Sequence, residues 1–283
     1  MIPSLPRTAA TRYATAAYVA LFLLFLFVPL AVVAIFAFND ASYPAPPWRG
    51  FTLDWFVGGH GHVGLFTDAP LLRSIVTSLV VATWVTLLSV IVGTANAFLL
   101  ERARFRGKAA LSVLALTPLV IPGVILGISI LALASRIAQF VDDTWGVELD
   151  FLRPGLPLVV AGQFSYIVSI ATLTIAARLR RFDAALEAAF NLGASRGAVL
   201  TTVTLPYLKP ALIGAAAISF LMSFENFNTT LMLVGSDPPL TIMMYGRMRE
   251  GATPALNAVS LFLMAASALI ALLLTRRAGR APA

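Results

Sequence analysis

Residues 14–38 read ATAAYVALFLLFLFVPLAVVAIFAF, a run of 25 residues without a charged side chain. A helix needs about 20 apolar residues to cross a bilayer, so this run is long enough to span one. The apolar core of a cleavable signal peptide has only about 7–15 residues, which favours a retained span over a removed leader. The run therefore predicts an integral membrane protein.

The rest of the chain has the same character. Of its 283 residues, 59% are hydrophobic and 12% are charged, and a soluble domain could not cover that much apolar surface. The period-two alternation of a membrane β-barrel is absent, so we expect an all-α integral membrane protein with six transmembrane helices. The five further apolar stretches are Ile75–Leu100, Ala109–Ser135, Leu156–Ala177, Tyr207–Val234 and Leu256–Thr275.

The basic residues fall mainly on one side of this topology. Fourteen of the 20 Lys and Arg residues lie in the N-terminal segment, the second and fourth connecting loops, and the C-terminal tail. Basic loops stay in the cytoplasm, so both termini are expected inside. The net charge of +7 then follows from topology and anionic lipid, and a nucleic-acid-binding function loses its support. The chain has no cysteine, which excludes disulfides and thiolate chemistry.

The predicted spans divide the chain into a cytoplasmic N-terminus, a first helix, a periplasmic loop, a five-helix core and a cytoplasmic tail. Their bounds are 1–13, 14–38, 39–72, 73–275 and 276–283. The core includes the cytoplasmic loop 178–206. In the last outer loop we expect a short interfacial helix or a re-entrant turn around Leu240–Tyr245, because that piece is apolar.

Proline and glycine interrupt the third stretch. Pro118 and Pro122 predict a kinked helix, because proline removes a backbone donor from the helix ladder. Gly123 and Gly127 have the spacing of small residues that allow close helix packing in bilayers. We expect packing rather than hinge motion to explain these residues.

The cytoplasmic loop 178–206 has helical rather than linker character. Asp183 can cap a helix, and Gly193 can end it. Ser195 can cap a second short helix through Thr202, and Leu205-Pro206 is expected to stop that helix before the next span. The helix between Asp183 and Gly193 is rich in alanine, and its small side chains permit close approach by a partner protein. The alternative is that this helix is amphipathic and lies on the lipid headgroups.

This loop resembles the coupling motif of the permease subunits of type I ABC importers. The family pattern is EAA, three residues, G, nine residues and I-x-L-P, and this chain has Glu187-Ala188-Ala189, Gly193 and Val203-Thr204-Leu205-Pro206. Val203 in place of Ile is the one departure. The resemblance covers roughly residues 70–272. It implies that the loop docks on an ATP-binding subunit through Asp183, Glu187, Ala188, Ala189, Gly193, Ala194, Leu205 and Pro206.

The resemblance also implies partners and a location. These are two ATP-binding subunits, a second and different permease chain, and a periplasmic solute-binding protein, in the bacterial inner membrane. ATP and magnesium would be bound by the partners and no cofactor by this chain, because the Gly107-Lys108 pair lacks the rest of a phosphate-binding loop. We expect no catalytic residue. We also expect no metal site, because His60 and His62 lack further ligands nearby.

Residues 220–233, FLMSFENFNTTLML, place a carboxylate in an apolar run. On a continuous helix, Phe220, Phe224, Phe227 and Leu231 would form one apolar stripe and leave Glu225 on the polar side. An acid within a membrane should face protein or water, so this side is expected to line a substrate pathway. The expected pathway residues are Ser219, Met222, Ser223, Glu225, Asn226 and Thr229, with Gln163 and Tyr166 from the fourth stretch.

Glu225 has two interpretations at this point. It can attract a cationic solute, or it can be a structural acid that hydrogen-bonds to Asn or Thr of neighbouring helices. The segment SFENFNTTLML and the following PPLTIMMYGRMREGATPALNA resemble the spermidine/putrescine branch of the family, which implies a polyamine substrate. A permease for a sugar, amino-acid derivative, anion or thiamine is one alternative. A membrane scaffold independent of an ATPase, or an intramembrane enzyme, is another.

Overall fold

The structure is a computed structural model that describes residues 9–180, 194–251 and 253–278. Side-chain surroundings are described as far as Ala268. Within these ranges the chain forms helices joined by turns and loops, with only isolated β-bridges in the first outer loop. The chain divides into two compact units. Unit 1 takes residues up to 72 and from 244 onward, and unit 2 takes residues 73–243.

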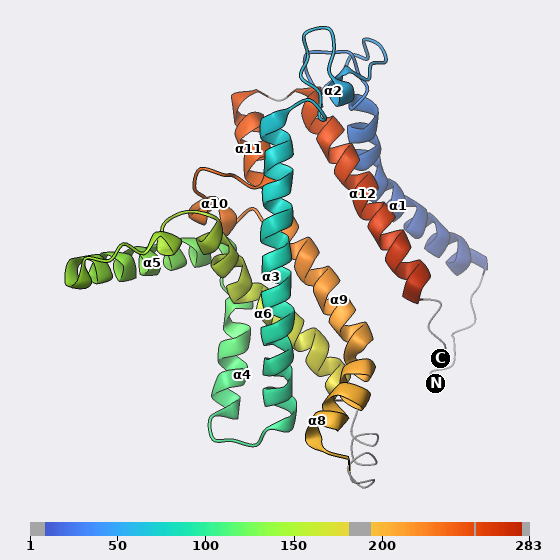
Figure 1. Ribbon diagram of the computed structural model, residues 1–283. Helices are drawn as coiled ribbons and strands as arrows, with labels where there is room; N and C mark the ends of the chain where they lie inside the picture. Colours follow the sequence, from blue (N-terminus) through green and yellow to red (C-terminus); the bar gives the residue numbers. More distant parts are fainter. Residues whose placement is uncertain (1–8, 181–193, 252, 279–283) are drawn as a thin grey trace. The chain divides into compact units, whose positions relative to one another are not determined.

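The described helices confirm an all-α membrane fold. Five helical runs are long and apolar enough to cross a membrane, and Figure 1 shows the ribbon with its helix labels. The sixth expected stretch forms α12 (Pro254–Ala278), which is apolar over Pro254–Ala268. The five runs are α1 (Ala9–Phe36), α3 (Ala69–Arg102), α5 (Gly123–Trp145), α6 (Leu156–Leu179) and the run Arg196–Phe224.

Unit 1 joins α1 and α12 to the first outer loop. The two helices contact each other, and α12 also contacts the short helix α2 (Asp54–Val57). Trp55 of α2 is buried within this loop and donates its indole N–H to the Asn39 carbonyl oxygen at 2.9 Å. The Asn39 side chain in turn accepts from the Arg49 backbone N–H at 2.8 Å. The outer loop is therefore an ordered structure held by a buried indole and a buried amide.

A bidentate ion pair between Asp68 and Arg247 joins two distant segments of unit 1. Asp68 accepts from the Leu71 backbone N–H at 3.0 Å, so it caps the start of α3. Its carboxylate also accepts from Arg247 on α11 (Leu240–Glu250), with Nη1–Oδ2 at 2.5 Å and Nη2–Oδ1 at 2.8 Å. Hydrogen bonding from Arg247 lowers the pKa of Asp68 below its ordinary value. The short helix expected around Leu240–Tyr245 is thus present as α11, and its Arg247 is tied to Asp68.

Replacing Asp68 with asparagine should loosen the first outer loop. Asparagine still caps a helix, but it removes a charge-assisted pair, for which we expect a loss of about 1.5–3 kcal/mol. The pair depends on an ionised Asp68 of lowered pKa. Its contribution is therefore present above the carboxyl's unfolded pKa and lost as the pH falls through the folded pKa. Limited proteolysis of residues 39–68 should proceed about tenfold faster in the variant.

The matched control is Asp54→Asn in the same loop. Asp54 pairs with His60 at 2.7 Å, but the His60 side chain is 89% exposed, and surface pairs contribute little. We expect nearly unchanged proteolysis in this control. Equal cleavage rates for wild type and Asp68→Asn would contradict a structural role for the ion pair.

Unit 2 is built around α6. This helix packs against α9 (Leu205–Phe224), and two apolar clusters of buried residues form its surroundings. Lipid tails are as apolar as these side chains, so moving the side chains out of lipid does not itself drive the helices together. Close van der Waals packing between the side chains holds the helices in place instead. The first cluster is Ala97, Ala171, Ile175, Ala176, Leu179, Leu208 and Ala215. The second is Val81, Val85, Ala134, Leu158, Val159, Ile167 and Leu233.

The third apolar stretch is broken rather than kinked. It forms α4 (Lys108–Leu116), one 3₁₀ turn over Thr117–Leu119, and then α5. Figure 1 shows α5 turning away from α4 at this point. Pro122 is the N-cap residue of α5 with an extended ψ of 133°. It cannot donate to the helix ladder and it disfavours helical geometry at the residue before it, so the helix ends and restarts.

The fifth stretch begins earlier than expected. Ser195 caps α8 (Arg196–Val199) by accepting from the Ala198 backbone N–H, which confirms the predicted cap. The expected stop at Leu205-Pro206 is wrong, because the chain continues through one π-helical turn (Leu200–Thr204) into α9. Pro206 lies in the first turn of α9, where a missing backbone N–H is tolerated.

Candidate functional site

The fifth stretch is interrupted at its acid. α9 ends at Phe224, Glu225 is the C-cap residue, and a new helix, α10 (Thr230–Leu233), starts five residues later. The expected continuous helix over Tyr207–Val234 is therefore wrong. Phe220 and Phe224 do stack, with ring centroids 6.0 Å apart. Phe227 and Leu231 lie beyond the break and do not extend that stripe.

Asn226 explains the break in physical terms. Its Oδ1 accepts from the Thr230 backbone N–H at 3.2 Å and from the Thr230 hydroxyl at 2.8 Å. Its Nδ2 donates to the Tyr166 phenol oxygen at 2.6 Å. Its backbone oxygen accepts from the Thr241 hydroxyl at 2.9 Å. An asparagine that bonds the backbone in this way offers the chain an alternative to the helix ladder.

A buried amide completes the network from the side of α6. Gln163 is 1% exposed and donates from Nε2 to the Thr230 hydroxyl at 2.8 Å. Its Oε1 accepts from the Ser223 hydroxyl. A buried amide needs such partners, so the residues order one another. We name the set Gln163, Tyr166, Ser223, Asn226 and Thr230 the polar cluster.

The sequence predicted four members of the polar cluster and missed one. Gln163, Tyr166, Ser223 and Asn226 were expected along the pathway, and the structure brings them together. Thr230 was left out, although it stands in the same polar run and bonds both amides. Helical periodicity over this stretch does place Thr230 on the polar side with Asn226 and Thr229, so the sequence carried a signal for it.

Glycines bring α5 and α6 close to this break. A Cβ on Gly127 would lie 3.0 Å from the Thr229 backbone oxygen, and one on Gly123 would lie 3.2 Å from the Thr229 hydroxyl. A Cβ on Gly162 would lie 2.2 Å from Leu233 Cδ1. The predicted close packing at Gly123 and Gly127 is thus confirmed. Small residues let backbones approach here as they do at other membrane helix contacts.

Three other expected pathway residues have different surroundings. Thr229 and Ser219 are buried, and their hydroxyls have no hydrogen-bond partner in the described part of the chain. Met222 packs against the second apolar cluster. It therefore contributes apolar packing rather than a polar wall to the site.

Glu225 has no side-chain hydrogen bond to the described residues of the polar cluster. Its side chain is exposed, and it makes no hydrogen bond or ion pair with the residues that the structure describes. The carbonyl end of α9 lies at the same position and carries partial negative charge. The structural interpretation, an acid bonded to Asn or Thr, finds no such bond among those residues. The break therefore places a carboxylate and the partial negative charge of a helix end next to the hydrogen-bonded polar cluster.

The coupling motif lies largely outside the described residues. Five of its residues are not described, so their role in docking an ATP-binding subunit stays a prediction. They are Asp183, Glu187, Ala188, Ala189 and Gly193. Ala194 is half-buried, and Leu205 and Pro206 are exposed.

The chain just before this segment is anchored by contacts that the sequence did not predict. Arg180 Nε donates to Glu101 Oε1 at 2.8 Å, and Arg102 Nη2 donates to the Leu179 carbonyl oxygen at 3.0 Å. These bonds hold the ends of α3 and α6 together. Each joins residues 77 or 79 positions apart, so no local pattern reveals them.

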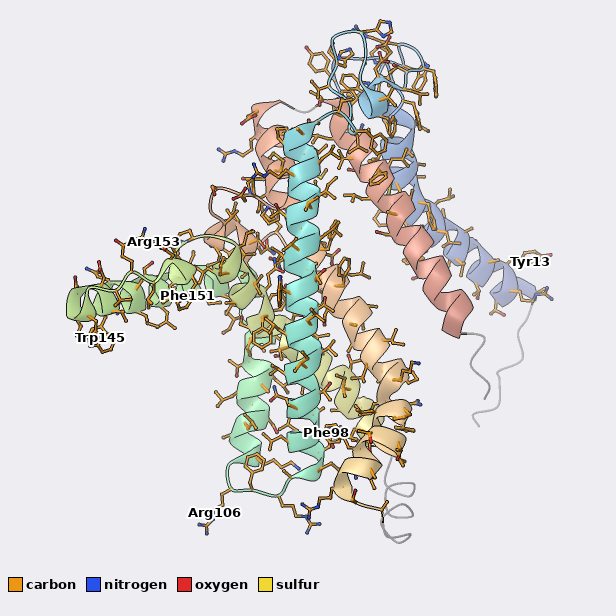
Figure 2. The ribbon with its side chains drawn as sticks, viewed as in Figure 1. Tyr13, Phe98, Arg106, Trp145, Phe151 and Arg153 are labelled. Carbon is orange, nitrogen blue, oxygen red and sulfur yellow. The ribbon has the colours of Figure 1, made fainter. Side chains whose placement is uncertain are left out.

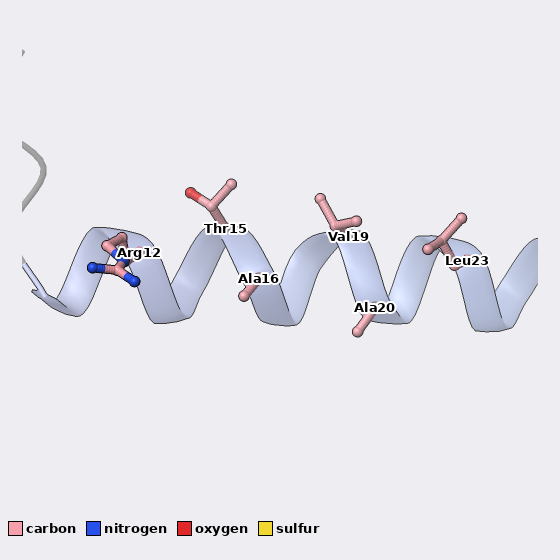
Figure 3. A pocket seen from close by; sticks show the side chains of 6 residues that line it. All are labelled: Arg12, Thr15, Ala16, Val19, Ala20 and Leu23. Carbon is pink, nitrogen blue, oxygen red and sulfur yellow. The ribbon is translucent and has the colours of Figure 1, made fainter. Parts of the chain in front are cut away.

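Two further features do not belong to this site. One face of α1 forms a hollow lined by Arg12, Ala16, Ala20 and neighbouring side chains, which Figure 3 shows along a single helix. In the outer loop, His60 Nδ1 bonds Asp54 Oδ2 at 2.7 Å, and this bond raises the pKa of His60.

Known proteins resemble this chain over most of its length. A family model described as "Binding-protein-dependent transport system inner membrane component" matches residues 89–278. The spermidine/putrescine transport system permease protein PotC of Haemophilus influenzae is 29% identical, over 89% of this chain and 93% of that protein. The putrescine transport system permease protein PotI of Escherichia coli is 26% identical, over 87% of this chain and 84% of that protein.

A solved structure shares the fold. It is a chain of a bacterial ABC transporter involved in the import of the acidic polysaccharide alginate, with a TM-score of 0.66 over 96% of this chain and 99% of that chain. The sequence identity is 11%, so this likeness concerns the fold alone.

Proposed function

The chain belongs to the family of binding-protein-dependent transport system inner membrane components, and we propose that the solute it helps to import is a polyamine such as spermidine or putrescine. It is a multi-pass inner membrane permease subunit. Members of this family are transport components rather than enzymes. The proposal concerns the substrate, the partners and the residues that act.

One observation carries the substrate proposal. Glu225 is an exposed carboxylate at the carbonyl end of α9, and no described cation neutralises it. Discontinuous helices in transporters place helix ends and unwound carbonyls at the solute, and a carbonyl end favours a cation. Polyamines are cationic at neutral pH. The polyamine names of PotC and PotI support the same substrate class.

The polar cluster has a supporting role in this proposal. Gln163 and Asn226 hold Ser223 and Thr230 on the two sides of the break. This arrangement would fix the direction of Glu225 without contacting its carboxylate. Tyr166 would add an aromatic face and a phenol to the wall of the pathway, both of which suit an alkylammonium group.

The proposed transport cycle uses partners for energy and delivery. A periplasmic solute-binding protein would release the polyamine to this chain and to a second, different permease subunit. Two ATP-binding subunits would bind ATP and magnesium and would dock on the loop 178–206. Their closure would move α6 and α9, the described helices that flank this loop, and change which side of the membrane can reach Glu225.

Uptake into proteoliposomes tests the substrate class. The complete transporter should import radiolabelled spermidine or putrescine in an ATP-dependent and saturable manner. A hundredfold excess of unlabelled polyamine should abolish that uptake, whereas a sugar, a neutral amino-acid derivative, an oxyanion or thiamine should not. Transport of one of these other solutes without competition by polyamines would contradict the proposal. Failure to copurify any ATP-binding subunit would contradict the proposed assembly.

A further inference from the structure

Unit 2 contains a groove between α4 and α6, at the ends near the basic loop 102–108. Its volume is about 300 Å³, and Leu100 and Glu101 of α3 close one end. Residues spaced three, four or seven apart on each helix line it, so each helix contributes one continuous face. The residues that carry the argument are Lys108, Ala115 and Leu116 from α4, and Leu173, Ala176 and Arg180 from α6.

The inside of the groove offers no free hydroxyl. Ser112 Oγ donates to the Lys108 carbonyl oxygen at 2.9 Å, and Thr172 Oγ1 donates to the Val168 carbonyl oxygen at 2.7 Å. Ser169 Oγ donates to the Ala115 carbonyl oxygen. Ser112 and Thr172 use their hydroxyl donors within their own helices, and Ser169 uses its donor across to α4. Most of the remaining lining is apolar. The interior therefore suits a hydrocarbon chain better than a polar solute.

The end of the groove is cationic. Arg180 uses Nε for Glu101, and its two terminal nitrogens bond no described residue. Lys108 has one long contact, 3.4 Å from Nζ to the Ala103 carbonyl oxygen. Because Glu101 offsets only one of the two cations, the end keeps a net positive charge. The basic loop that begins here is on the side expected to face the cytoplasm.

We propose that this groove binds an anionic phospholipid of the cytoplasmic leaflet. The phosphate contacts Lys108 and Arg180, and one acyl chain lies between α4 and α6 along Leu116 and Leu173. A basic pocket between membrane helices on the cytoplasmic side has the charge and the depth that an anionic headgroup requires. A polyamine is a poor occupant, because its ammonium groups would face two cations.

Photolabelling of the complete transporter tests this proposal. The complex is placed in phosphatidylcholine bilayers with a small fraction of phosphatidylglycerol that carries a photoreactive group in its acyl chain. Labelled peptides should map to α4 and α6 at the groove. Unlabelled phosphatidylglycerol should compete, whereas phosphatidylcholine and inorganic phosphate should not. Labelling that phosphatidylcholine competes equally well, or that free phosphate displaces, would overturn the proposal.

Variants locate the headgroup and the acyl chain separately. Lys108→Gln removes one charge near the membrane surface and should weaken labelling about fivefold. The matched control is Arg106→Gln in the same loop, because Arg106 is exposed and does not line the groove. Figure 2 shows its side chain extending from the loop away from the helices. Ala115→Phe fills the apolar part and should abolish labelling although both cations remain. Equal labelling in Lys108→Gln and wild type, with both complexes intact by size-exclusion chromatography, would also overturn the proposal.

Discussion

Replacing Glu225 with glutamine is expected to raise the KM for polyamine uptake at least about tenfold, with a smaller effect on the amount of assembled transporter. An interaction with a charged partner contributes about 1.5–3 kcal/mol, and 1.4 kcal/mol corresponds to a factor of ten. Glutamine keeps the size and the polarity of the side chain but removes its charge. The carboxylate makes no bond to a described residue, so its removal should leave the folded chain intact.

The kinetic pattern separates attraction from structure. Loss of a contact made equally with bound solute and transition state raises KM and leaves the maximal rate unchanged. Loss of a structural contact would instead lower the amount of assembled complex. The measurement is initial uptake of labelled spermidine over a range of concentrations, divided by the amount of transporter in the membrane.

Two controls make the Glu225 result specific. Glu225→Asp keeps the charge and should recover most of the uptake at low substrate. Glu148→Gln removes an exposed glutamate that pairs with Arg153 at 2.9 Å, far along the chain from the helix break. A surface pair of this kind contributes little, so uptake should stay at the wild-type level. Unchanged KM and rate in Glu225→Gln would rule out cation attraction by this residue.

Replacing Gly235 with alanine should strongly destabilise the transporter. A Cβ at this position would lie 2.5 Å from the Pro154 carbonyl oxygen and 3.1 Å from the Gly155 Cα. Gly155 also donates its backbone N–H to the Leu233 carbonyl oxygen at 2.9 Å. Because backbone rather than a flexible side chain fills the space, one of the two segments must move. Such overpacking typically costs about 1–3 kcal/mol.

The displacement should disturb the polar cluster as well as lower the stability of the complex. Gly155 is the N-cap residue of α6, and α6 carries Gln163 and Tyr166. Moving the start of α6 away from α10 would therefore strain the polar cluster. We expect a lower melting temperature, by roughly 2–4 °C for each kcal/mol lost. Less of the complex should also survive solubilisation. Thermal unfolding of the purified complex measures the melting temperature, and the amount of complex recovered after solubilisation measures the second effect.

Gly214→Ala is the matched control. Gly214 lies within α9, and a Cβ there would meet no atom within 4 Å. Alanine is the better helix former by about 1 kcal/mol, so this change should leave the melting temperature unchanged or raise it. Equal melting temperatures for Gly235→Ala and wild type would show that the chain relaxes freely around position 235.

The features that follow from local chemistry were predictable from the sequence. The uncharged run 14–38 and the later apolar stretches predicted membrane helices, because a bilayer requires about 20 apolar residues in a row. Ser195 was recognised as a helix cap because its hydroxyl can reach a backbone N–H three residues on. The fixed spacing from Glu187 to Pro206 pointed to the family that the comparisons show.

The features that follow from contacts between distant residues depended on the tertiary structure. The hydrophobic periodicity of residues 207–234 predicts one continuous helix. It cannot show that the Asn226 side chain accepts a hydrogen bond from the Thr230 backbone N–H and that the helix is interrupted there. Asp68 and Arg247 are 179 positions apart, and nothing in either local sequence announces their ion pair. Hydrophobic patterning fixes which segments enter the membrane, because each residue contributes its own transfer free energy. Which polar groups meet inside it depends on pairs of residues, and only packing decides those pairs.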